Sequence, residues 1–570
     1  MNVIVIMNDS LRRDHVAAYG APPPWERLGR AADEAFIQTP SLDRLAGESA
    51  LFERFYVSSY PTIPCRTDLF TGRYSFPRRP WQPLEPTDVT LPELARRAGA
   101  LPVLFFDTPP LGNDDGNFTR GFAGWQWVRG QHADRWNVDP IDPPLPAQPH
   151  KLKATPATKL YLRNAASRVY ERDWMCAKTL TATMDWLERN RHRGRVGGEP
   201  GFVLYVDMWD PHEPFDAPDF DLERYADPSF HGDQVIYPQY GRPDYFSKEE
   251  HNHVRALYAA LVTLSDRWLG HLLDKLDVVG LAKNTLVVHL TDHGHLFGEH
   301  ELQGKPGGPL GNLYEPTLRI PLMIRHPDGV GAGTRVKGLA QHVDLLPTIL
   351  EALGAETSVD VEGKSLWPLI RGERESVREH AFSGRYPNEL ARVLGEGRGG
   401  AGMAVAQFDG AAGVGAASSR LVEALTITTE DWALICSPRG RKSELYDLRK
   451  DPRQEHNVID REVDAARALH AELIRFLETT GASPARIEPF RGDVVASGEA
   501  AEPPAFPDDT PLWVFQDERG LPISFRSEAA AQAHASGRAL TSTTFGQLRA
   551  KNPKALLHTP TQYYWLSDLA

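Results

Sequence analysis

Four short apolar runs of the sequence each end at polar residues of types that bind metal ions or transfer protons. Asp and His side chains ligate divalent metals, and His also acts as a general acid or base near neutral pH. A single polar strand end is ordinary because loops are polar, but four ends that offer Asp or His favour one shared site. The four ends are Asn8-Asp9-Ser10, Asp107-Thr108, Asp210-Pro211-His212 and Thr291-Asp292-His293.

The apolar runs themselves predict the elements that hold these side chains. The runs "NVIVIM", "PVLFF", "GFVLYVDMW" and "TLVVHL" are typical of buried strands in a largely parallel sheet. Between them, apolar residues recur at helical spacing over residues 171–190 and 248–276. Strands that alternate with helices indicate an α/β fold, in which ligands bind at the carboxyl ends of the strands. All four polar clusters fall at such ends.

The composition argues against several classes of protein. The chain has 570 residues, of which 41% are hydrophobic, enough for one large core and one or two smaller units. Its net charge of −13 lacks the Lys/Arg excess of nucleic-acid binders. The three cysteines are too few for a disulfide framework and fit a reducing compartment. Since no apolar run approaches the roughly 20 residues of a membrane span, we expect a cytoplasmic protein without membrane or nucleic-acid partners.

Changes in composition divide the chain into three parts. Residues 1–375 hold the strand and helix patterns, and residues 376–490 form a C-terminal subdomain in which "DWALICSPRGRKSELYDLRKDP" predicts a hairpin. Within it, the Gly/Ala-rich stretch 395–418 is expected to be a mobile loop. Residues 491–570 form an extension with a further hairpin candidate, "PLWVFQDERGLPISF". Its aromatic clusters predict a surface that is buried, and we expect it to pack on a neighbouring subunit of a homo-oligomer.

Seven segments, in order over residues 1 to about 480, resemble the sulfatase branch of the alkaline phosphatase superfamily. The resemblance implies an α/β sandwich with a large mixed, mainly parallel sheet flanked by helices, and a smaller C-terminal α+β subdomain. The segments are "NVIVIMNDSLRRDHVAAYG", "TPSLDRLAGESALFERFYV", "TLPELARRAGALPVLFFDT", "DPHEPF", "LTDHGHLFGEHELQGK", "QHVDLLPTILEALG" and "ELYDLRKDPRQEHN". In addition, "YPTIPCRTDLFTGRY" resembles the nucleophile segment of the same family.

The segment "YPTIPCRTDLFTGRY" departs from the family pattern at the nucleophile. Sulfatases carry there a Cys that is oxidised to formylglycine, followed by a frame that is kept here as Pro64, Arg66 and Thr71-Gly72-Arg73. Thr62 occupies the position of that Cys, and Cys65 lies three residues later. The residue type therefore excludes formylglycine. Thr62 is predicted to be the nucleophile, although a Thr at this point also serves as a helix N-cap.

The resemblance implies one divalent metal ion bound by Asp9, Asp292 and His293, with Thr62 as a further ligand. Two carboxylates and an imidazole suit Mn²⁺ or Zn²⁺ better than Ca²⁺. Ser10 stands where many family members have a second Asp, so the ligand set resembles that of the phosphonate monoester hydrolases and phosphodiesterases. A second metal at His342 and Asp344, with Asp210 or His212, is an alternative that the sequence leaves open.

The family pattern also implies roles around the substrate. Arg66, His212 and Lys305 are predicted to be catalytic, through contact with the transferred group or protonation of the leaving group. Asp107, Thr108 and His300 are predicted to bind substrate. Asp107 and Thr108 stand where sulfatases often carry a Lys and a nearby His, so positive charge is lost there. A monoanionic diester, or an ester with its own cationic part, is therefore expected to fit better than a dianionic ester.

Three functions are compatible with these residues. A Thr ester cannot collapse to an aldehyde as a formylglycine ester does, so its intermediate must be hydrolysed by water. This favours a metal-dependent hydrolase of phosphodiesters or phosphonate monoesters that acts on a small anionic ester. The alternatives are a sulfuric ester hydrolase without formylglycine and a non-catalytic binding protein of sulfatase type.

Overall fold

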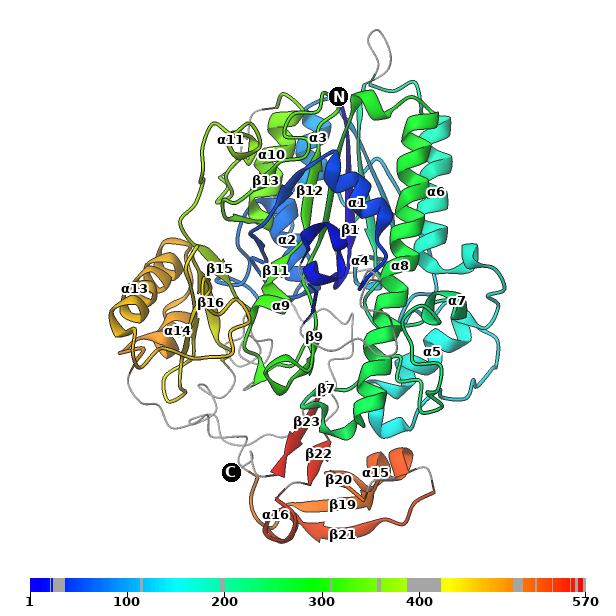
Figure 1. The fold of residues 1–570 in the computed structure, drawn as a ribbon, viewed down its shortest axis with the longest axis vertical. Coiled ribbons are helices and arrows are strands. Elements are labelled where there is room, and N and C mark those ends of the chain that lie inside the picture. Colours follow the sequence, from blue (N-terminus) through cyan, green and yellow to red (C-terminus); the bar gives the residue numbers. More distant parts are fainter. Residues whose placement is uncertain are drawn as a thin grey trace.

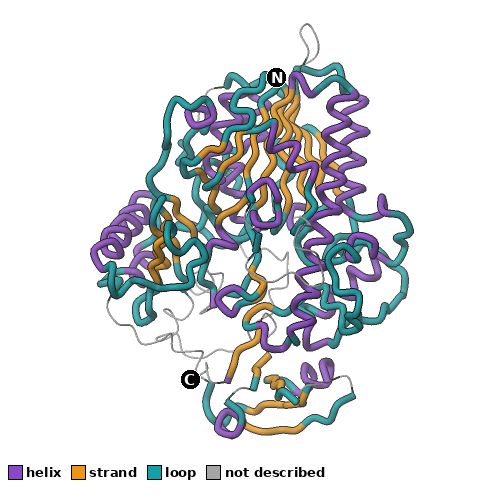
Figure 2. Tube along the Cα trace, in the orientation of Figure 1, coloured by secondary structure: helices purple, strands orange, loops and turns teal. Residues whose placement is uncertain are grey.

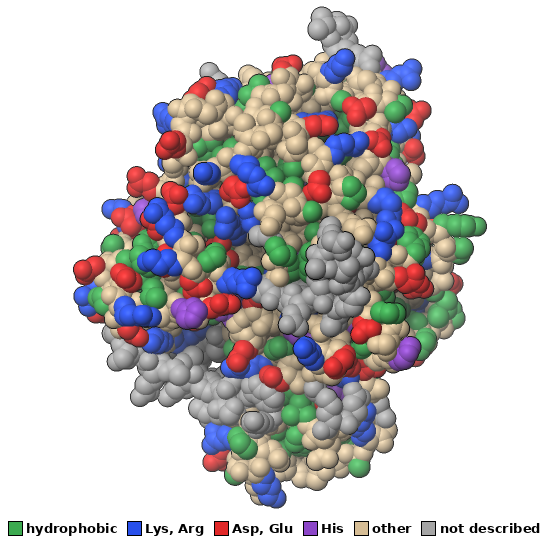
Figure 3. All heavy atoms as spheres, in the orientation of Figure 1, with side chains coloured by type: hydrophobic (Ala, Val, Ile, Leu, Met, Phe, Trp, Pro, Cys, Tyr) green, Lys and Arg blue, Asp and Glu red, His purple; other side chains and the backbone are tan. Residues whose placement is uncertain are grey.

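The computed structural model describes most of the chain and shows its parts in contact (Figure 1). No helix among the described residues has both the length and the apolar character to cross a membrane. Acidic and basic side chains are interspersed over the face seen in Figure 3. The described residues are 1–20, 22–23, 36–112, 116–194, 200–307, 310–355, 360–386, 422–495, 506–517, 520–535, 537–553, 555–558 and 562–566.

An eight-stranded mixed sheet forms the centre of the catalytic part, in the order β13-β2-β12-β8-β1-β6-β4-β5. Its five strands from β8 to β5 are parallel, while β12 runs antiparallel to β8. The predicted mainly parallel sheet is confirmed, and every residue of β1, β6 and β8 is buried. The strands are β1 (Asn2–Asn8), β2 (Ala50–Phe52), β4 (Leu101–Phe106), β5 (Gly124–Trp127), β6 (Phe202–Met208), β8 (Thr285–Thr291), β12 (Leu322–Arg325) and β13 (Arg335–Val336).

Helices cover both faces of this sheet, as Figure 2 shows. Side chains of β1 alternate between the faces, because successive residues of a strand point to opposite sides. Ile4 and Ile6 join the core beneath α1 (Pro40–Gly47), α6 (Met175–Arg189) and α8 (Lys248–Val278). Val3 and Val5 join the core beneath α2 (Thr62–Thr71), α3 (Leu91–Arg97) and α10 (Leu345–Ala352). The two predicted helical patterns are thus confirmed as α6 and α8.

Short elements complete the catalytic part. A three-stranded sheet joins β11 (Arg319–Ile320), β3 (Phe55–Tyr56) and β14 (Ala340–Gln341). The remaining short helices are α4 (Pro109–Gly112), α5 (Thr155–Ala165), α7 (Asp219–Leu222), α9 (Glu315–Leu318) and α11 (Trp367–Ile370).

The C-terminal subdomain is a four-stranded antiparallel sheet covered by α13 (Val463–Thr479), with the short helix α14 (Pro484–Ile487) beside it. Its strands are β15 (Ala381–Ser383), β16 (Leu425–Thr428), β17 (Trp432–Cys436) and β18 (Glu444–Asp447). The predicted hairpin is confirmed, because β17 and β18 pair antiparallel. The Gly/Ala-rich stretch 395–418 lies outside the described residues.

The C-terminal extension adds five strands to a second sheet that reaches into the catalytic part. Strand β23 pairs in parallel with β7 (Tyr240–Gly241), which pairs with β10 (Gln303–Gly304) and through it with β9 (Leu296–Phe297). The predicted hairpin is formed by β19 and β20. The extension contains β19 (Pro511–Gln516), β20 (Pro522–Phe525), β21 (Thr541–Thr544), β22 (Leu556–His558) and β23 (Gln562–Trp565), with α15 (Glu528–Ala535) and α16 (Phe545–Lys551).

The described part of the extension packs on its own chain. Its buried side chains Phe515, Ile523 and Phe525 belong to the same core cluster as Ile4 of the central sheet. Leu512, Val514 and Phe545 form a smaller cluster within the extension. These apolar groups are therefore buried within their own chain rather than reserved for a neighbouring subunit. The homo-oligomer stays a prediction that this packing does not require.

We expect a chain that ends at Val495 to be less stable and less active than the full chain. The truncation removes the strand that pairs with Tyr240–Gly241 and uncovers apolar core, so the melting temperature should fall by at least about 5 °C. Calorimetry and turnover of an aryl ester measure the two effects. A truncated chain with unchanged melting temperature and activity would show that the extension is an independent appendage.

Candidate active site

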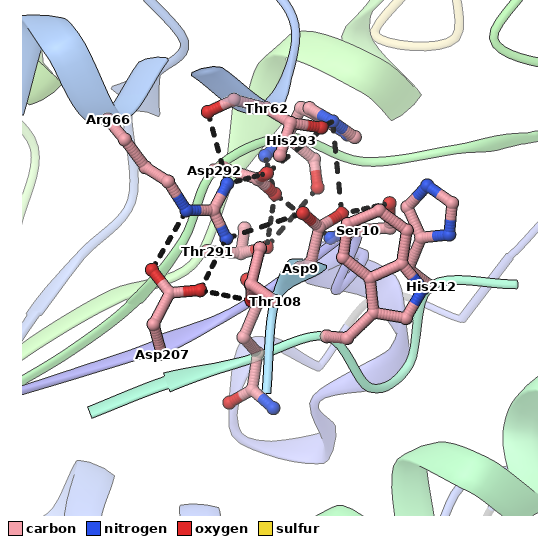
Figure 4. Close-up of polar contacts among 12 residues, drawn as sticks. Asp9, Ser10, Thr62, Arg66, Thr108, Asp207, His212, Thr291, Asp292 and His293 are labelled. Atoms are coloured by element: carbon pink, nitrogen blue, oxygen red, sulfur yellow. Dashed lines mark hydrogen bonds and ion pairs between the residues drawn. The ribbon is translucent and has the colours of Figure 1, made fainter. Parts of the chain in front are cut away.

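The predicted site residues from three separate strand and helix ends meet at the carboxyl edge of the central sheet. Asp9 follows β1, Asp292 and His293 follow β8, and Thr62 is the first residue of α2. Figure 4 shows their side chains facing one another, with Arg66 and Asp207 beside them. The parallel pairing of β1 with β8 places Asn8 opposite Thr291, so the residues that follow emerge together.

One atom from each of Asp9, Asp292 and His293 lies within 4.8 Å of the others, and all three side chains are buried. His293 Nε2 is 3.5 Å from Asp292 Oδ2 and 4.0 Å from Asp9 Oδ1. The Thr62 hydroxyl oxygen is 3.4 Å from the same nitrogen. The structure thus brings together all four predicted metal ligands.

The buried guanidinium of Arg66 contacts the carboxylates of this cluster. Arg66 donates from Nε and Nη2 to Asp207, at 2.8 Å each, and from Nη1 to Asp292 Oδ2 at 2.6 Å. Nη1 also donates to the Thr62 carbonyl at 3.1 Å, and Nη2 lies 3.3 Å from Asp9 Oδ2. The side chain of Arg66 is fully buried and bound to protein oxygens, which makes it a positioning residue in this structure.

The site has more negative than positive charge. Asp9, Asp207 and Asp292 surround one Arg66, and all four side chains are fully buried. Buried charges are costly unless they are paired or bind a metal. Three carboxylates against one guanidinium leave an excess that one divalent cation would neutralise.

The atoms that face the centre of the cluster fit a metal ion. Asp9 Oδ2 is buried and accepts no hydrogen bond. His293 Nδ1 is 2.9 Å from the Gly294 carbonyl, which can only accept, so Nδ1 carries the proton and Nε2 presents its lone pair. In ligating His residues, the ring nitrogen that does not bind the metal typically donates to a group such as a backbone carbonyl, which fixes the orientation of the ring. Asp9, Asp292, His293 and the Thr62 oxygen are thus able to hold one divalent ion.

The protonation states agree with this ligand set. Burial lowers the pKa of His293 to about 3, so its imidazole is neutral at physiological pH. Burial acts to raise the pKa of Asp292, but His293 and Arg66 hold that pKa below its usual range. Burial and the neighbouring Asp292 raise the pKa of Asp9 well above its usual value. Repulsion between the two carboxylates is the kind of cost that a cation relieves.

Lys305 and His212 lie beside the metal ligands and share one carboxylate. Lys305 Nζ donates to Glu213 Oε2 at 2.8 Å and to Ser10 Oγ at 3.1 Å, and Ser10 Oγ donates to Asp9 Oδ1 at 2.8 Å. His212 Nδ1 lies 2.7 Å from the Glu213 carbonyl and 3.0 Å from Glu213 Oε2. Since both are acceptors, Nδ1 carries the proton and Nε2 is left as an acceptor. Burial and Lys305 lower the pKa of His212 to about 4.

The predicted substrate-binding residues occupy different places. Asp107 is fully buried, and its two oxygens accept from Thr179 Oγ1 at 2.8 Å and from the Trp209 N–H at 2.6 Å. Thr108 donates to Asp207, so it supports the carboxylate that holds Arg66. His300 stacks on Tyr314, with 3.6 Å between ring centroids. None of the three makes a described contact with Asp9, Asp292 or Thr62.

The alternative second metal site is not assembled among the described residues. Asp344 pairs with Arg378, and His342 Nε2 lies 2.9 Å from the Thr291 carbonyl. A further Asp-Glu-His group at Asp451, Glu455 and His456 lies on the surface and is unrelated to the site.

Sequence reasoning missed Asp207 and Glu213. Asp207 lies inside the run "GFVLYVDMW", and a charged residue within a buried strand requires a partner, which is the signal that was available. Glu213 lies inside "DPHEPF", but nothing in the sequence indicates that it pairs with Lys305, about ninety residues away.

The chain belongs to the sulfatase family, because residues 1–355 match the family model for sulfatases. It is 27% identical over 432 residues to the multifunctional alkaline phosphatase superfamily protein PehA of Trinickia caryophylli, over 65% of this chain and 77% of that protein. It is 23% identical over 539 residues to the N-acetylglucosamine-6-O-sulfatase of Bacteroides thetaiotaomicron, over 84% of this chain and 86% of that protein.

A solved structure has the same fold. The phosphonate monoester hydrolase of Agrobacterium radiobacter aligns with a TM-score of 0.60 at 23% identity, over 84% of this chain and 95% of that one. The α/β fold predicted from the sequence is thereby confirmed. The chain is an ester hydrolase of the sulfatase family, and its relatives are named for both sulfur and phosphorus esters.

We expect Asp292→Asn to lose bound metal and activity while the chain stays folded. The change removes one ligand charge, so metal content should fall from about one ion per chain to below about 0.1. Elemental analysis and circular dichroism measure metal and fold. Asp68→Asn is the matched control, since Asp68 is also fully buried but bonds to Ser58, Ser59 and Ser75. Equal metal loss in both variants would contradict the assignment.

Proposed function

We propose that this chain hydrolyses phosphodiesters or phosphonate monoesters through a covalent intermediate on Thr62. The observation that carries the proposal is the position of the Thr62 hydroxyl, 3.4 Å from His293 Nε2 inside the cluster of candidate metal ligands. Thr62 supplies an oxygen nucleophile, but its ester cannot collapse to an aldehyde as a formylglycine ester does. The intermediate must therefore be hydrolysed by water, which favours phosphorus esters over sulfate esters.

The start of α2 supports this role for Thr62. The helix has ten residues, and its first N–H groups lack partners within the helix, so they attract anionic oxygens of a bound ester. Arg66 fixes the Thr62 carbonyl from the next turn of the same helix. The nucleophile is therefore held on a rigid element next to a positive helix end.

The charges near Thr62 favour a monoanionic ester. Arg66 is already surrounded by three carboxylates, and Lys305 is paired with Glu213. The net positive charge left for the substrate is therefore small. A phosphodiester or phosphonate monoester carries one negative charge at neutral pH, whereas a phosphate monoester carries nearly two.

The two chemical steps use groups of this chain. In the first, the Thr62 hydroxyl loses its proton to solvent and Oγ attacks phosphorus, while the bond to the leaving alcohol breaks and the alcohol oxygen takes the electron pair and a proton from solvent. In the second, water attacks phosphorus and gives a proton to His212 Nε2, which passes it to solvent, while the bond from phosphorus to Thr62 Oγ breaks and that oxygen takes the electron pair and a proton from solvent. Lys305 stabilises a non-bridging oxygen. A divalent ion, for which this ligand set favours Mn²⁺ or Zn²⁺, would lower the pKa of the Thr62 hydroxyl and polarise the ester.

Cys65 is not a competing nucleophile. Its side chain is fully buried, and burial raises the pKa of its thiol well above the usual value. The thiolate is the reactive form, so a buried thiol of this kind is inert.

We expect Thr62→Ala to lower kcat by at least about 10³-fold and Thr62→Ser to retain part of the activity, since only Ala lacks the oxygen. Thr67→Ala is the matched control, because Thr67 lies on the same helix and both Thr side chains are 3% exposed. Steady-state kinetics on an aryl phosphonate measures the effect. Comparable losses at the two positions would assign the effect to helix packing.

We expect kcat/KM for 4-nitrophenyl phenylphosphonate or bis(4-nitrophenyl) phosphate to exceed that for 4-nitrophenyl sulfate by at least about tenfold. The comparison uses one leaving group, so it reports the preference for the transferred group. A preference for the sulfate ester would favour a sulfuric ester hydrolase without formylglycine.

A further inference from the structure

Lys153 lies at the edge of the active site on a segment that is fixed by the backbone. The segment 151–153 runs antiparallel to residues 237–239, where Leu152 pairs with Pro238. The Lys153 N–H donates to the Tyr237 carbonyl at 2.8 Å, and the Gln239 N–H donates to the Lys151 carbonyl at 3.1 Å. These bonds lie directly before β7, so the segment and Tyr240 are held together.

Lys153 and Lys305 both lie close to the aromatic ring of Tyr240. The Lys153 ammonium lies 3.8 Å from the centre of the Tyr240 ring, and the Lys305 ammonium lies 5.5 Å from the same centre. The two nitrogens are therefore no farther apart than the sum of these distances. A cation on an aromatic face is stabilised by the ring but keeps its full charge.

Lys153 differs from the neighbouring lysines in having no carboxylate partner among the described residues. Lys151 pairs with Asp233 at 3.0 Å and with Glu250 at 2.5 Å. Lys305 pairs with Glu213 at 2.8 Å. The charges that act on Lys153 are Glu213, which is already bound to Lys305, and the like charges of Lys305 and Arg385.

Tyr237 and His132 connect Lys153 with His212. The rings of His132 and His212 are 6.1 Å apart, and His132 Nε2 is 2.8 Å from the Tyr237 hydroxyl. Lys153 lies 5.4 Å from the centre of the Tyr237 ring. Its charged neighbours are Glu213, Lys305 and Arg385, and no metal ligand is among them. Lys153 therefore shares the surroundings of Lys305 and His212 but contacts none of the candidate metal ligands in the described structure.

We propose that Lys153 binds a second anionic group, a carboxylate or a phosphate, on the leaving-group side of the substrate. The inference rests on the proposed function, since it assumes that the ester is cleaved at Thr62. It assigns a substrate class: esters with one negative charge at the reacting group and a further negative charge on the alcohol. An ammonium without a carboxylate partner, close enough to Lys305 and Arg385 for their charges to act on it, is the group that such an anion would neutralise. Burial lowers the pKa of Lys153 to about 8, as expected where the charge is not yet matched.

The turnover experiment compares two substrates that differ only in a carboxylate on the leaving group. They are 4-nitrophenyl phenylphosphonate and its 3-carboxy-4-nitrophenyl analogue. We expect the ratio of kcat/KM values to favour the carboxylated ester at least about tenfold in the natural chain. The preference should disappear in Lys153→Met, which keeps the apolar stem, and persist in part in Lys153→Arg. Lys159→Met is the matched control, because Lys159 is a surface residue of α5 that pairs with Asp142.

A binding arm separates this proposal from the proposed function. Titration calorimetry with the two leaving alcohols, 4-nitrophenol and 3-carboxy-4-nitrophenol, needs no turnover, so it reports on Lys153 even if the esters are not cleaved. The carboxylated ligand should bind at least about tenfold more tightly to the natural chain and lose that advantage in Lys153→Met. An unchanged preference in Lys153→Met, or no preference in the natural chain, overturns the subsite. Absence of turnover with the binding preference intact overturns the hydrolase proposal alone.

Discussion

The active site depends on one buried guanidinium that is surrounded by three carboxylates. Arg66 contacts Asp9, Asp207 and Asp292, and it also fixes the carbonyl of Thr62. These contacts join the ends of β1, β6 and β8 to the start of α2. Because the carboxylates outnumber the guanidinium, the same cluster that orders the site also requires a further positive charge. The order of this cluster and its capacity to hold a cation thus have one electrostatic origin.

The second sheet, which the C-terminal extension completes, leads to residues beside the candidate metal ligands. Tyr240 and Gln303 lie on β7 and β10 of the sheet that the C-terminal extension completes, and Lys305 follows β10 directly. The extension, although it contains no candidate catalytic residue among its described residues, therefore pairs with the segment that leads to Lys305. Lys153 donates its backbone N–H to the carbonyl of Tyr237, three residues before β7.

The sequence predicts the parts of the molecule that follow local rules. Continuous apolar runs predict the buried strands, and the polar residues at their ends predict Asp9, Asp292 and His293 as one cluster, because parallel strands end at one edge. Long-range pairs were not predictable: Asp107 was expected to contact substrate, but it bonds to Thr179 of α6. The partners of Arg66 and Lys305 lie more than ninety residues away in most cases, and no local pattern encodes them. The apolar extension was assigned to a subunit contact because sequence alone does not say which surface covers it.

The most direct test of the account is to identify the residue that carries the covalent intermediate. His212→Asn should slow hydrolysis of the intermediate and let it accumulate. After incubation with 4-nitrophenyl phenylphosphonate and an acid quench, peptide mass spectrometry should locate a phenylphosphonyl group on Thr62. The adduct should be absent from the Thr62→Ala chain. An adduct on Cys65 or on another side chain, or continued turnover in the Thr62→Ala chain, would contradict the central claim.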